Sequence, residues 1–256
     1  MTALVNKDSH LVASPLYKRA EAAMVERLVN RTWQPGQRIP NEFELADEFN
    51  VSQGTIRKAL NAMERRGLLS RSPGKGTVVA KTTPVDALYA FFRMRDSGDG
   101  RMVVPEPLSE AIERRDATDE ELQHLEPTST KVFELRRVRQ SGGRPLVVEK
   151  MSFSTILCPS MDKDLPLPNS LYPYLQDHYG IAVMSARESI ASIKATSDIA
   201  MALGIEVGAP VLRVKRWARD LAGRVIELRS SHYSTDFSNY EVELERVNSV
   251  SDLLKG

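Results

Sequence analysis

The sequence predicts an α+β protein of two domains, and three observations lead to this fold class. Residues 15–80 read as helices followed by a short hairpin, whereas residues 131–235 read as paired strands with helices between them. A length of 256 residues is enough for two domains of ordinary size. A polar segment ending in Pro84 separates the two patterns. We expect an arm at residues 1–14, a first domain at 15–80, a linker at 81–86, a second domain at 87–248 and a tail at 249–256.

The composition excludes several classes of protein. Hydrophobic residues make up 41% of the chain and charged residues 27%, which is typical of a soluble globular protein. No apolar run approaches the ~20 residues that a membrane helix needs, and the first residues lack the pattern of a secretory signal. The single Cys158 excludes an internal disulfide, and the four histidines are not spaced as metal ligands. We therefore expect a cytoplasmic protein without a cofactor and without a membrane partner.

The first part of the first domain reads as two helices. Apolar residues three and four positions apart predict a helix over residues 15–30. Asn41 is a good N-cap for a second helix over residues 42–49, and Glu44 closes a capping box. In that short helix we expect four buried side chains: Phe43, Leu45, Ala46 and Phe49.

A turn, a third helix and a hairpin follow. Asn50 can adopt the left-handed conformation that such a turn needs. Ser52 caps the next helix, which runs to about Arg66 and is ended by Gly67. Its apolar stripe consists of Ile56, Ala59, Leu60 and Met63. Short strands are predicted at residues 68–71 and 77–80, around a glycine-containing tip. Together these are the parts of a winged helix-turn-helix, which places its second helix in the major groove of DNA.

The charge of the chain supports contact with nucleic acid. The net charge is only +1, but residues 51–80 carry +5 and residues 81–256 carry −3. Such a cluster attracts phosphates through counterion release, although a charge cluster alone also fits a solvated helix face. Gln can read adenine and Arg can read guanine, while hydroxyls and helix N-terminal amides suit phosphate oxygens. We predict DNA contacts at Ser52, Gln53, Gly54, Thr55, Arg57, Lys58, Lys75 and Gly76. The alternative is a winged helix used for protein contact.

One long motif carries a family resemblance. Residues 40–78 contain P-x-E-x-x-L-A-x-x-x-x-V-S-x-x-T-I-R-x-A-L, then G-L-L and G-x-G-T-x-V. This stretch resembles the GntR superfamily of bacterial transcription regulators, and the resemblance implies a double-stranded DNA operator as partner. Two positions depart from the family, which often has Arg where this chain has Gln53 and Phe43. Both departures remove a guanidinium from the interface, and we expect Phe43 to belong to the core.

The second domain alternates between strands and helices. Asn169 is expected to cap the first helix, and Gly180 to end it. The turn Ser141-Gly142-Gly143 joins the first two strands. We predict strands at 131–140, 145–154, 183–194, 211–218, 225–235 and 240–244, and helices at 170–179 and 197–203. Strand pairs of this kind favour a largely antiparallel sheet.

This order of elements resembles the UTRA ligand-binding domain of the HutC subfamily, which shares its fold with chorismate lyase. The likeness covers roughly residues 87–245. It is carried by Arg137-x-Arg139, Gly143-x-Pro145 with Glu149, Ala202-Leu203-Gly204, Gly208-x-Pro210-Val211-Leu212, and Glu227 with Tyr233 and Asp236. The resemblance implies a cavity under the sheet that binds a small metabolite, often one with a carboxylate or a phosphate.

Two arginines are the leading candidates for that ligand. Arg137 and Arg139 alternate along one strand, so both side chains point to the same face, where two guanidinium groups could grip an anion. The remaining candidates, which would read the polar part of the ligand, are Glu149, Ser152, Glu227, Arg229 and Tyr233. The alternative is that Arg137 or Arg139 makes a cross-strand ion pair with Glu149.

From these features we expect a metabolite-responsive, sequence-specific DNA-binding transcription regulator. It would be a repressor released by a small anionic effector, and it would bind its operator as a homodimer. One alternative is an architectural DNA-binding protein without an effector. Another is an enzyme of chorismate-lyase-like fold, although no positioned nucleophile, metal cluster or acid–base pair stands out in the sequence.

Overall fold

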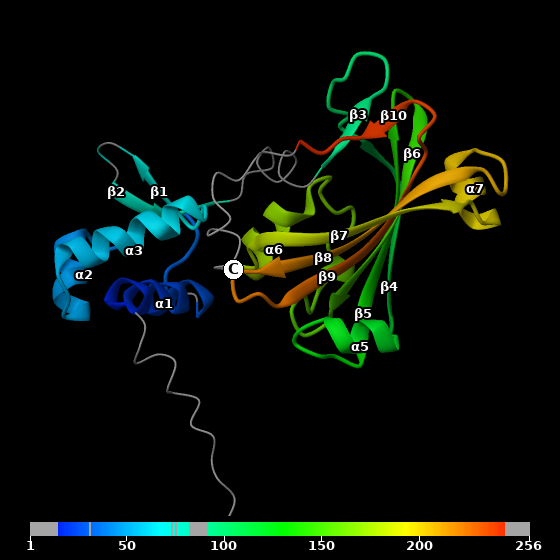
Figure 1. Ribbon diagram of the computed structural model, residues 1–256. Helices are drawn as coiled ribbons and strands as arrows, with labels where there is room; N and C mark the ends of the chain where they lie inside the picture. Colours follow the sequence, from blue (N-terminus) through cyan, green and yellow to red (C-terminus); the bar gives the residue numbers. More distant parts are fainter. Residues whose placement is uncertain (1–14, 31, 73, 75, 82–91, 244–256) are drawn as a thin grey trace, which may run out of the picture. The chain divides into compact units, whose positions relative to one another are not determined.

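The computed structural model describes residues 15–30, 32–72, 74, 76–81 and 92–243. It divides into two compact units, whose main bodies are the N-terminal helices with their hairpin and a six-stranded sheet (Figure 1). Each is described by itself. The expected arm, most of the linker, Lys75, residues 87–91 and the C-terminal residues from 244 onward lie outside the described residues.

The N-terminal unit has the predicted winged helix-turn-helix elements. Helices α1 (Leu16–Val29), α2 (Glu42–Phe49) and α3 (Gln53–Arg65) are followed by strands β1 (Leu69–Ser72) and β2 (Gly76–Val79). The two strands are antiparallel, with Leu69 opposite Val79 and Ser72 opposite Gly76. The helices and the hairpin share one core, which includes Met24, Leu45, Ile56, Leu60, Met63 and Leu69. Its apolar side chains fix α3 against α1 and α2.

The predicted caps of α2 and α3 are confirmed. Asn41 accepts hydrogen bonds from the backbone of Phe43 and Glu44, and the Glu44 carboxylate accepts one from the Asn41 backbone, which completes the capping box. Asn50 ends α2 with φ 51° and ψ 50°, in the left-handed region. Ser52 accepts from the Thr55 backbone at the start of α3. Local sequence therefore decides where α2 ends and where α3 begins.

The prediction for Phe43 was wrong. Leu45 and Ala46 are the buried residues of α2, and Phe49 is half-buried, but the Phe43 side chain is 68% exposed. The reason is helical geometry: Phe43 precedes Leu45 by two residues, or about 200° around the helix. A residue there cannot share the face that Leu45 buries.

The other unit is built on one antiparallel sheet. Its strand order is β4-β5-β6-β9-β8-β7. The strands are β4 (Glu106–Asp116), β5 (Lys131–Ser141), β6 (Arg144–Ser154), β7 (Val183–Lys194), β8 (Pro210–Asp220) and β9 (Val225–Tyr233). Strands β3 (Met94–Asp96) and β10 (Ser238–Tyr240) form a separate antiparallel pair. The helices of this unit are α5 (Asp119–His124) and α7 (Ser197–Leu203), with a 3-10 turn, η1, at Met161–Lys163. Helix α6 (Leu171–Tyr179) is grouped with the N-terminal unit.

The strand register assigns side chains to two faces. Glu110, Arg137, Glu149 and Ser231 lie opposite one another in a single row across β4, β5, β6 and β9. Because side chains alternate along a strand, Arg139, Arg229 and Tyr233 share this face with them. We call it the arginine face. The neighbouring residues Lys150, Ser152, Leu228 and Ser230 belong to the opposite face.

Several predictions for this unit need correction. The sequence pattern missed β4 and α5 entirely. Asn169 does not cap α6: the N-cap is Ser170, without a side-chain cap, and the Asn169 amide instead bonds Arg139 and the Pro105 carbonyl. The last strand is Ser238–Tyr240, earlier than predicted. The two central hairpins, α7 and the antiparallel sheet are confirmed.

Candidate nucleic-acid interface and effector site

The leading turn of α3 presents polar groups to solvent. Ser52 and Gly54 are exposed, and Gln53 and Thr55 are half-buried. The Ser52 and Thr55 hydroxyls lie 2.9 Å apart and hydrogen-bond one another. A cap of this kind leaves other amides of the first turn without helical partners, and such amides can bind phosphate oxygens.

Arg57 already has a protein partner. Its Nε donates to Glu42 Oε2 at 2.9 Å, and its Nη2 lies 2.8 Å from the same oxygen. The side chain nevertheless stays 61% exposed. Glu42 also lies 3.6 Å from Arg71 of β1, whose Nη1 donates to Asn61 at 2.8 Å. Glu42 thus holds two cations, and a base contact by Arg57 requires exchange of this ion pair.

The remaining predicted DNA residues are Lys58 on α3 and Lys75 and Gly76 at the hairpin. The Lys58 ammonium lies 4.1 Å from the centre of the Tyr17 ring on α1, in a cation–π contact. Lys75 lies outside the described residues. Gly74 and Gly76 both have positive φ, at 78° and 76°, which gives the tip of the hairpin its tight path.

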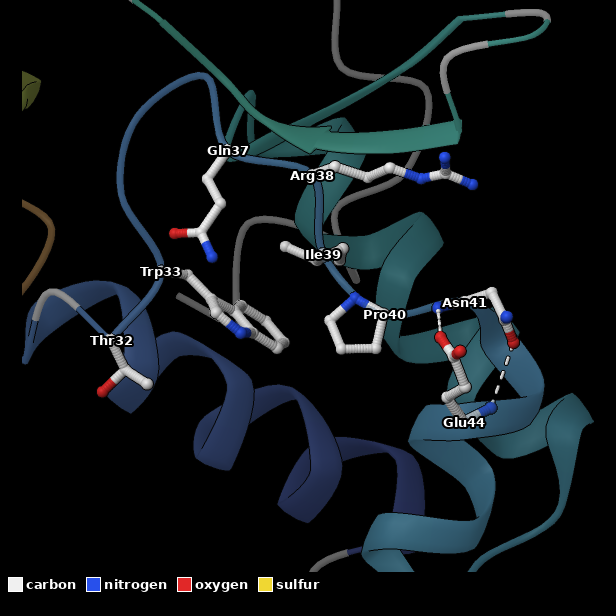
Figure 2. A pocket seen from close by; sticks show the side chains of 8 residues that line it. All are labelled: Thr32, Trp33, Gln37, Arg38, Ile39, Pro40, Asn41 and Glu44. Atoms are coloured by element: carbon white, nitrogen blue, oxygen red, sulfur yellow. Dashed lines mark hydrogen bonds between the residues drawn. The ribbon is translucent and has the colours of Figure 1, made fainter.

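One cation near the hairpin was missed by the sequence reasoning. Arg38 is exposed and forms a β-bridge with Val78, and its Nε lies 3.0 Å from the position that a Cβ at Gly76 would occupy. It borders an open hollow of about 450 Å³ together with Thr32, Trp33, Gln37, Ile39, Pro40, Asn41 and Glu44 (Figure 2). Asn41 and Glu44 are used by the capping box, and Gln37 accepts from the Gln34 backbone. The signal in the sequence was a basic residue directly before Ile39-Pro40.

On the arginine face, both candidate arginines are buried. Arg137 is 2% exposed, and it donates to Glu110 at 2.9 Å and to the Leu167 carbonyl at 3.0 Å. Arg139 is 6% exposed and contacts Glu149 at 3.4 Å and Asn169 at 2.7 Å. The cross-strand ion pair that we considered as an alternative is therefore present for Arg139. The Nε of Arg139 has no hydrogen-bond partner among the described residues, so one buried donor remains for a ligand.

Acidic side chains balance these arginines. Glu149 accepts from Arg229 at 3.0 Å and from Ser231 at 3.3 Å, and Arg229 lies 2.6 Å from Glu227. Burial alone would raise the pKa of Glu149, but Arg229, Arg139 and Arg137 outweigh it and lower that pKa to about 2. Burial and the Glu149 charge raise the pKa of the buried Tyr233. Near neutral pH, Glu149 is therefore ionised and Tyr233 is protonated.

Ser152 is separated from the other six candidates. It lies on the opposite face of the sheet, where its hydroxyl donates to Glu121 at 2.5 Å. Glu121 also binds Arg115 at 2.6 Å. These groups border a second hollow of about 240 Å³, together with Lys150, Lys215 and Trp217 among others. Ser152 therefore does not join Arg137 and Arg139 in one site.

The described residues offer no group of three or more His, Cys, Asp or Glu side chains that could hold a metal ion. In the same part of the chain, no helix is both long and apolar enough to cross a lipid bilayer. The groups present are a helix end with cationic side chains on one unit and a buried Arg–Glu network on the other.

Comparisons with known proteins agree with both units. Residues 16–79 match the family described as bacterial regulatory proteins, gntR family, and residues 108–238 match the UTRA domain. The chain is 27% identical to the HTH-type transcriptional repressor NagR of Bacillus subtilis (strain 168), over 95% of this chain and 99% of NagR. It is 29% identical to the probable fructoselysine utilization operon transcriptional repressor of Escherichia coli (strain K12), over 80% of this chain and 84% of that protein.

A solved structure resembles the sheet unit. It is the ligand-binding domain of a protein from Bordetella bronchiseptica described as a GntR-family transcriptional regulator. The TM-score is 0.55 at 25% identity, and the match covers 60% of this chain and 98% of that one. With a gntR-type winged helix followed by a UTRA domain that spans more than half of its length, the chain belongs to the gntR family of bacterial regulatory proteins, in its HutC-like, UTRA-carrying branch.

Proposed function

We propose that this chain is a transcriptional repressor whose α3 enters the major groove of an operator, and whose arginine face binds a small anionic effector that releases it. The observation that carries the proposal is the union of the two units in one chain: an exposed, capped helix end with cationic side chains, followed by a sheet with buried arginines. Repressors head the relatives that the chain matches along most of its length. The protein would act in the cytoplasm, where its DNA lies.

The proposed DNA contacts are those at the start of α3 and at the hairpin. Ser52, Thr55 and the helix amides would hold phosphates, while Gln53 and Arg57 would read base edges. Gly54 would let the backbone approach the duplex. Gly76 and Lys75 would follow the phosphate backbone or the minor groove. Lys58 would have to leave the Tyr17 ring to contribute.

The proposed effector site is formed by Arg137, Arg139, Glu149, Glu227, Arg229 and Tyr233. A carboxylate or phosphate is the ligand class that two guanidinium groups favour. Arg139 is the strongest candidate, because its Nε is buried without a partner among the described residues. Glu149 and Glu227 would accept hydrogen bonds from hydroxyls or amides of the same ligand.

The proposed active form is a homodimer. A single recognition helix contacts only a few base pairs, and two-fold symmetry doubles the site length. The effector would bind one arrangement of the two N-terminal units better than the other, which shifts the population between them. The expected linker, residues 81–86, is where we propose that this arrangement changes.

The test begins with a thermal-shift screen of metabolites against the full chain, carboxylates and phosphorylated sugars first. A ligand at 100 times its dissociation constant stabilises the folded state by about 2.7 kcal/mol. Operator selected from random DNA is then bound by the protein and challenged with the stabilising metabolite. Release of the operator is the expected result.

Two variants on the same strand make the test specific. Arg139→Ala should bind the operator but no longer release it, because it lacks the proposed ligand contact. Arg136→Ala is the matched control: Arg136 is on the opposite face, 60% exposed, and pairs with Glu113 and Glu134. Equal release by Arg139→Ala and the parent would remove Arg139 from the site, and a flat response to every metabolite would favour an architectural protein.

A further inference from the structure

Phe43 is the most unusual exposed residue of the N-terminal unit. It is 68% exposed, and no other Phe, Tyr or Trp side chain among the described residues is exposed. Single exposed apolar residues are ordinary on protein surfaces. What distinguishes Phe43 is its position in the first turn of α2, next to Glu42, which is bonded to Arg57 of α3.

The direction of the Phe43 side chain follows from its neighbours on α2. Glu48 marks the side that faces α1, because it is bonded to Arg27 of that helix. Phe43 lies five positions earlier, or about 140° around the helix from Glu48. Leu45 and Ala46 mark the side that faces the core. Phe43 lies about 160° around the helix from Leu45 and about 60° from Ala46, so it stands at the edge of the core face, and its 68% exposed side chain reaches solvent.

We infer that Phe43 is a base-reading residue, which recognises thymine through van der Waals contact with its C5 methyl group in the major groove. This inference rests on the proposed entry of α3 into that groove. A phenyl ring has no hydrogen bond to offer, and the thymine methyl is the apolar group that the major groove presents. Burying the exposed ring against that methyl would remove apolar surface of both partners from water.

The experiment removes the methyl group and nothing else. The operator is selected from a random DNA library with the full chain, and each thymine is then replaced in turn by deoxyuridine. For the parent protein, one replacement per half-site should weaken binding about fourfold, the effect expected for one buried methyl. Phe43→Ala should bind both forms of that site equally. Leu16→Ala, which removes a 56% exposed side chain of α1, should keep the fourfold difference.

A second variant tests the base preference. Phe43→Arg should select guanine where the parent selects thymine, because Arg bonds the O6 and N7 of guanine. The inference fails if no thymine methyl affects binding of the parent, or if Phe43→Ala remains as sensitive to deoxyuridine as the parent. In either case specific operator binding would persist. Loss of specific binding by the parent itself would instead contradict the proposed function.

Discussion

At the scale of the residue, Arg57 pairs with Glu42 in the free protein and is proposed to read a base in the complex with DNA. In the free protein its guanidinium bonds Glu42 and stays largely exposed. An exposed ion pair of this kind contributes little to stability. A bidentate contact with guanine is worth more, ~1–3 kcal/mol of discrimination. In the proposed complex, a base would therefore replace Glu42 as the partner of Arg57.

The prediction for Arg57 concerns base preference. Arg57→Ala should cost ~1–3 kcal/mol of operator affinity and relax the preference at one position of each half-site. Arg65→Ala, at the far end of the same helix, removes the same charge and should leave that preference intact. The measurement is a competition assay over all four bases at each position. An unchanged base profile for Arg57→Ala would exclude it from base reading.

A second residue-scale prediction concerns acid stability. Burial alone would raise the pKa of Glu121, but Arg115, Ser152 and Thr118 lower it from 4.5 to about 2. A carboxylate with a depressed folded pKa stabilises the fold above pH 4.5, and this contribution is lost as the pH falls from 4.5 to about 2. Glu121→Gln retains the capping-box geometry without the charge. Its free energy of unfolding should therefore fall less steeply over that range than the parent's, as measured by urea denaturation.

The control for this prediction is Glu113→Gln. Glu113 is also a carboxylate paired with an arginine, but its side chain is 52% exposed. The Glu113→Gln variant should show the same decrease in the free energy of unfolding below pH 4.5 as the parent. Identical decreases for Glu121→Gln and the parent would show that the Arg115–Glu121 pair does not set the pH dependence.

At the scale of the element, capping decides the helix-turn-helix. Asn41, Asn50 and Ser52 define three of its four helix ends through side-chain or left-handed backbone geometry. Asn41→Ala should destabilise the protein by ~1 kcal/mol, because two backbone amides lose their acceptor. Thermal unfolding measures the change, and Gln123→Ala on the exposed side of α5 is the neutral control. A melting temperature equal to the parent's would mean that the core alone fixes α2.

The sequence predicted elements whose signals are local and missed those whose signals are not. The caps and glycine turns gave α2, α3 and the β5–β6 hairpin correctly. Strand β4 was missed because it is an edge strand with mostly exposed polar residues, so it shows no apolar alternation. Helix α5 has six residues, too few for a helical period.

The predictions for the two sites divide in the same way: features with local signals were predicted, and contacts between distant residues were not. That Arg137 and Arg139 share a face followed from strand alternation alone. The partners of Arg137, Glu110 and the Leu167 carbonyl, are 27 and 30 residues away in sequence and could not be foreseen. The exposure of Phe43 was misjudged because its aromatic character outweighed its position on the helix. Ser152 was grouped with Glu149 as a ligand candidate, although three positions along one strand put the two side chains on opposite faces.

At the scale of the whole molecule, the two activities must be coupled by a free energy. A coupling of ~1–3 kcal/mol changes operator affinity about 5- to 150-fold, and linkage requires operator DNA to change effector affinity by the same factor. We predict that equality for the metabolite found in the thermal-shift screen. Titration calorimetry with and without operator measures one factor, and operator titrations with and without metabolite measure the other. Two factors of one would mean that the metabolite binds a site that is not coupled to the operator.

The shared carboxylate of Glu42 also has a consequence inside the cell. It offsets positive charge at Arg57 and Arg71, so the free N-terminal unit displaces fewer counterions when it meets unrelated DNA. If Arg57 contacts DNA as proposed, binding to the bulk chromosome would be weaker, while a base contact at the operator would still replace that ion pair. Fewer copies would be sequestered by the millions of competing genomic positions, so a small number of molecules could keep the operator occupied.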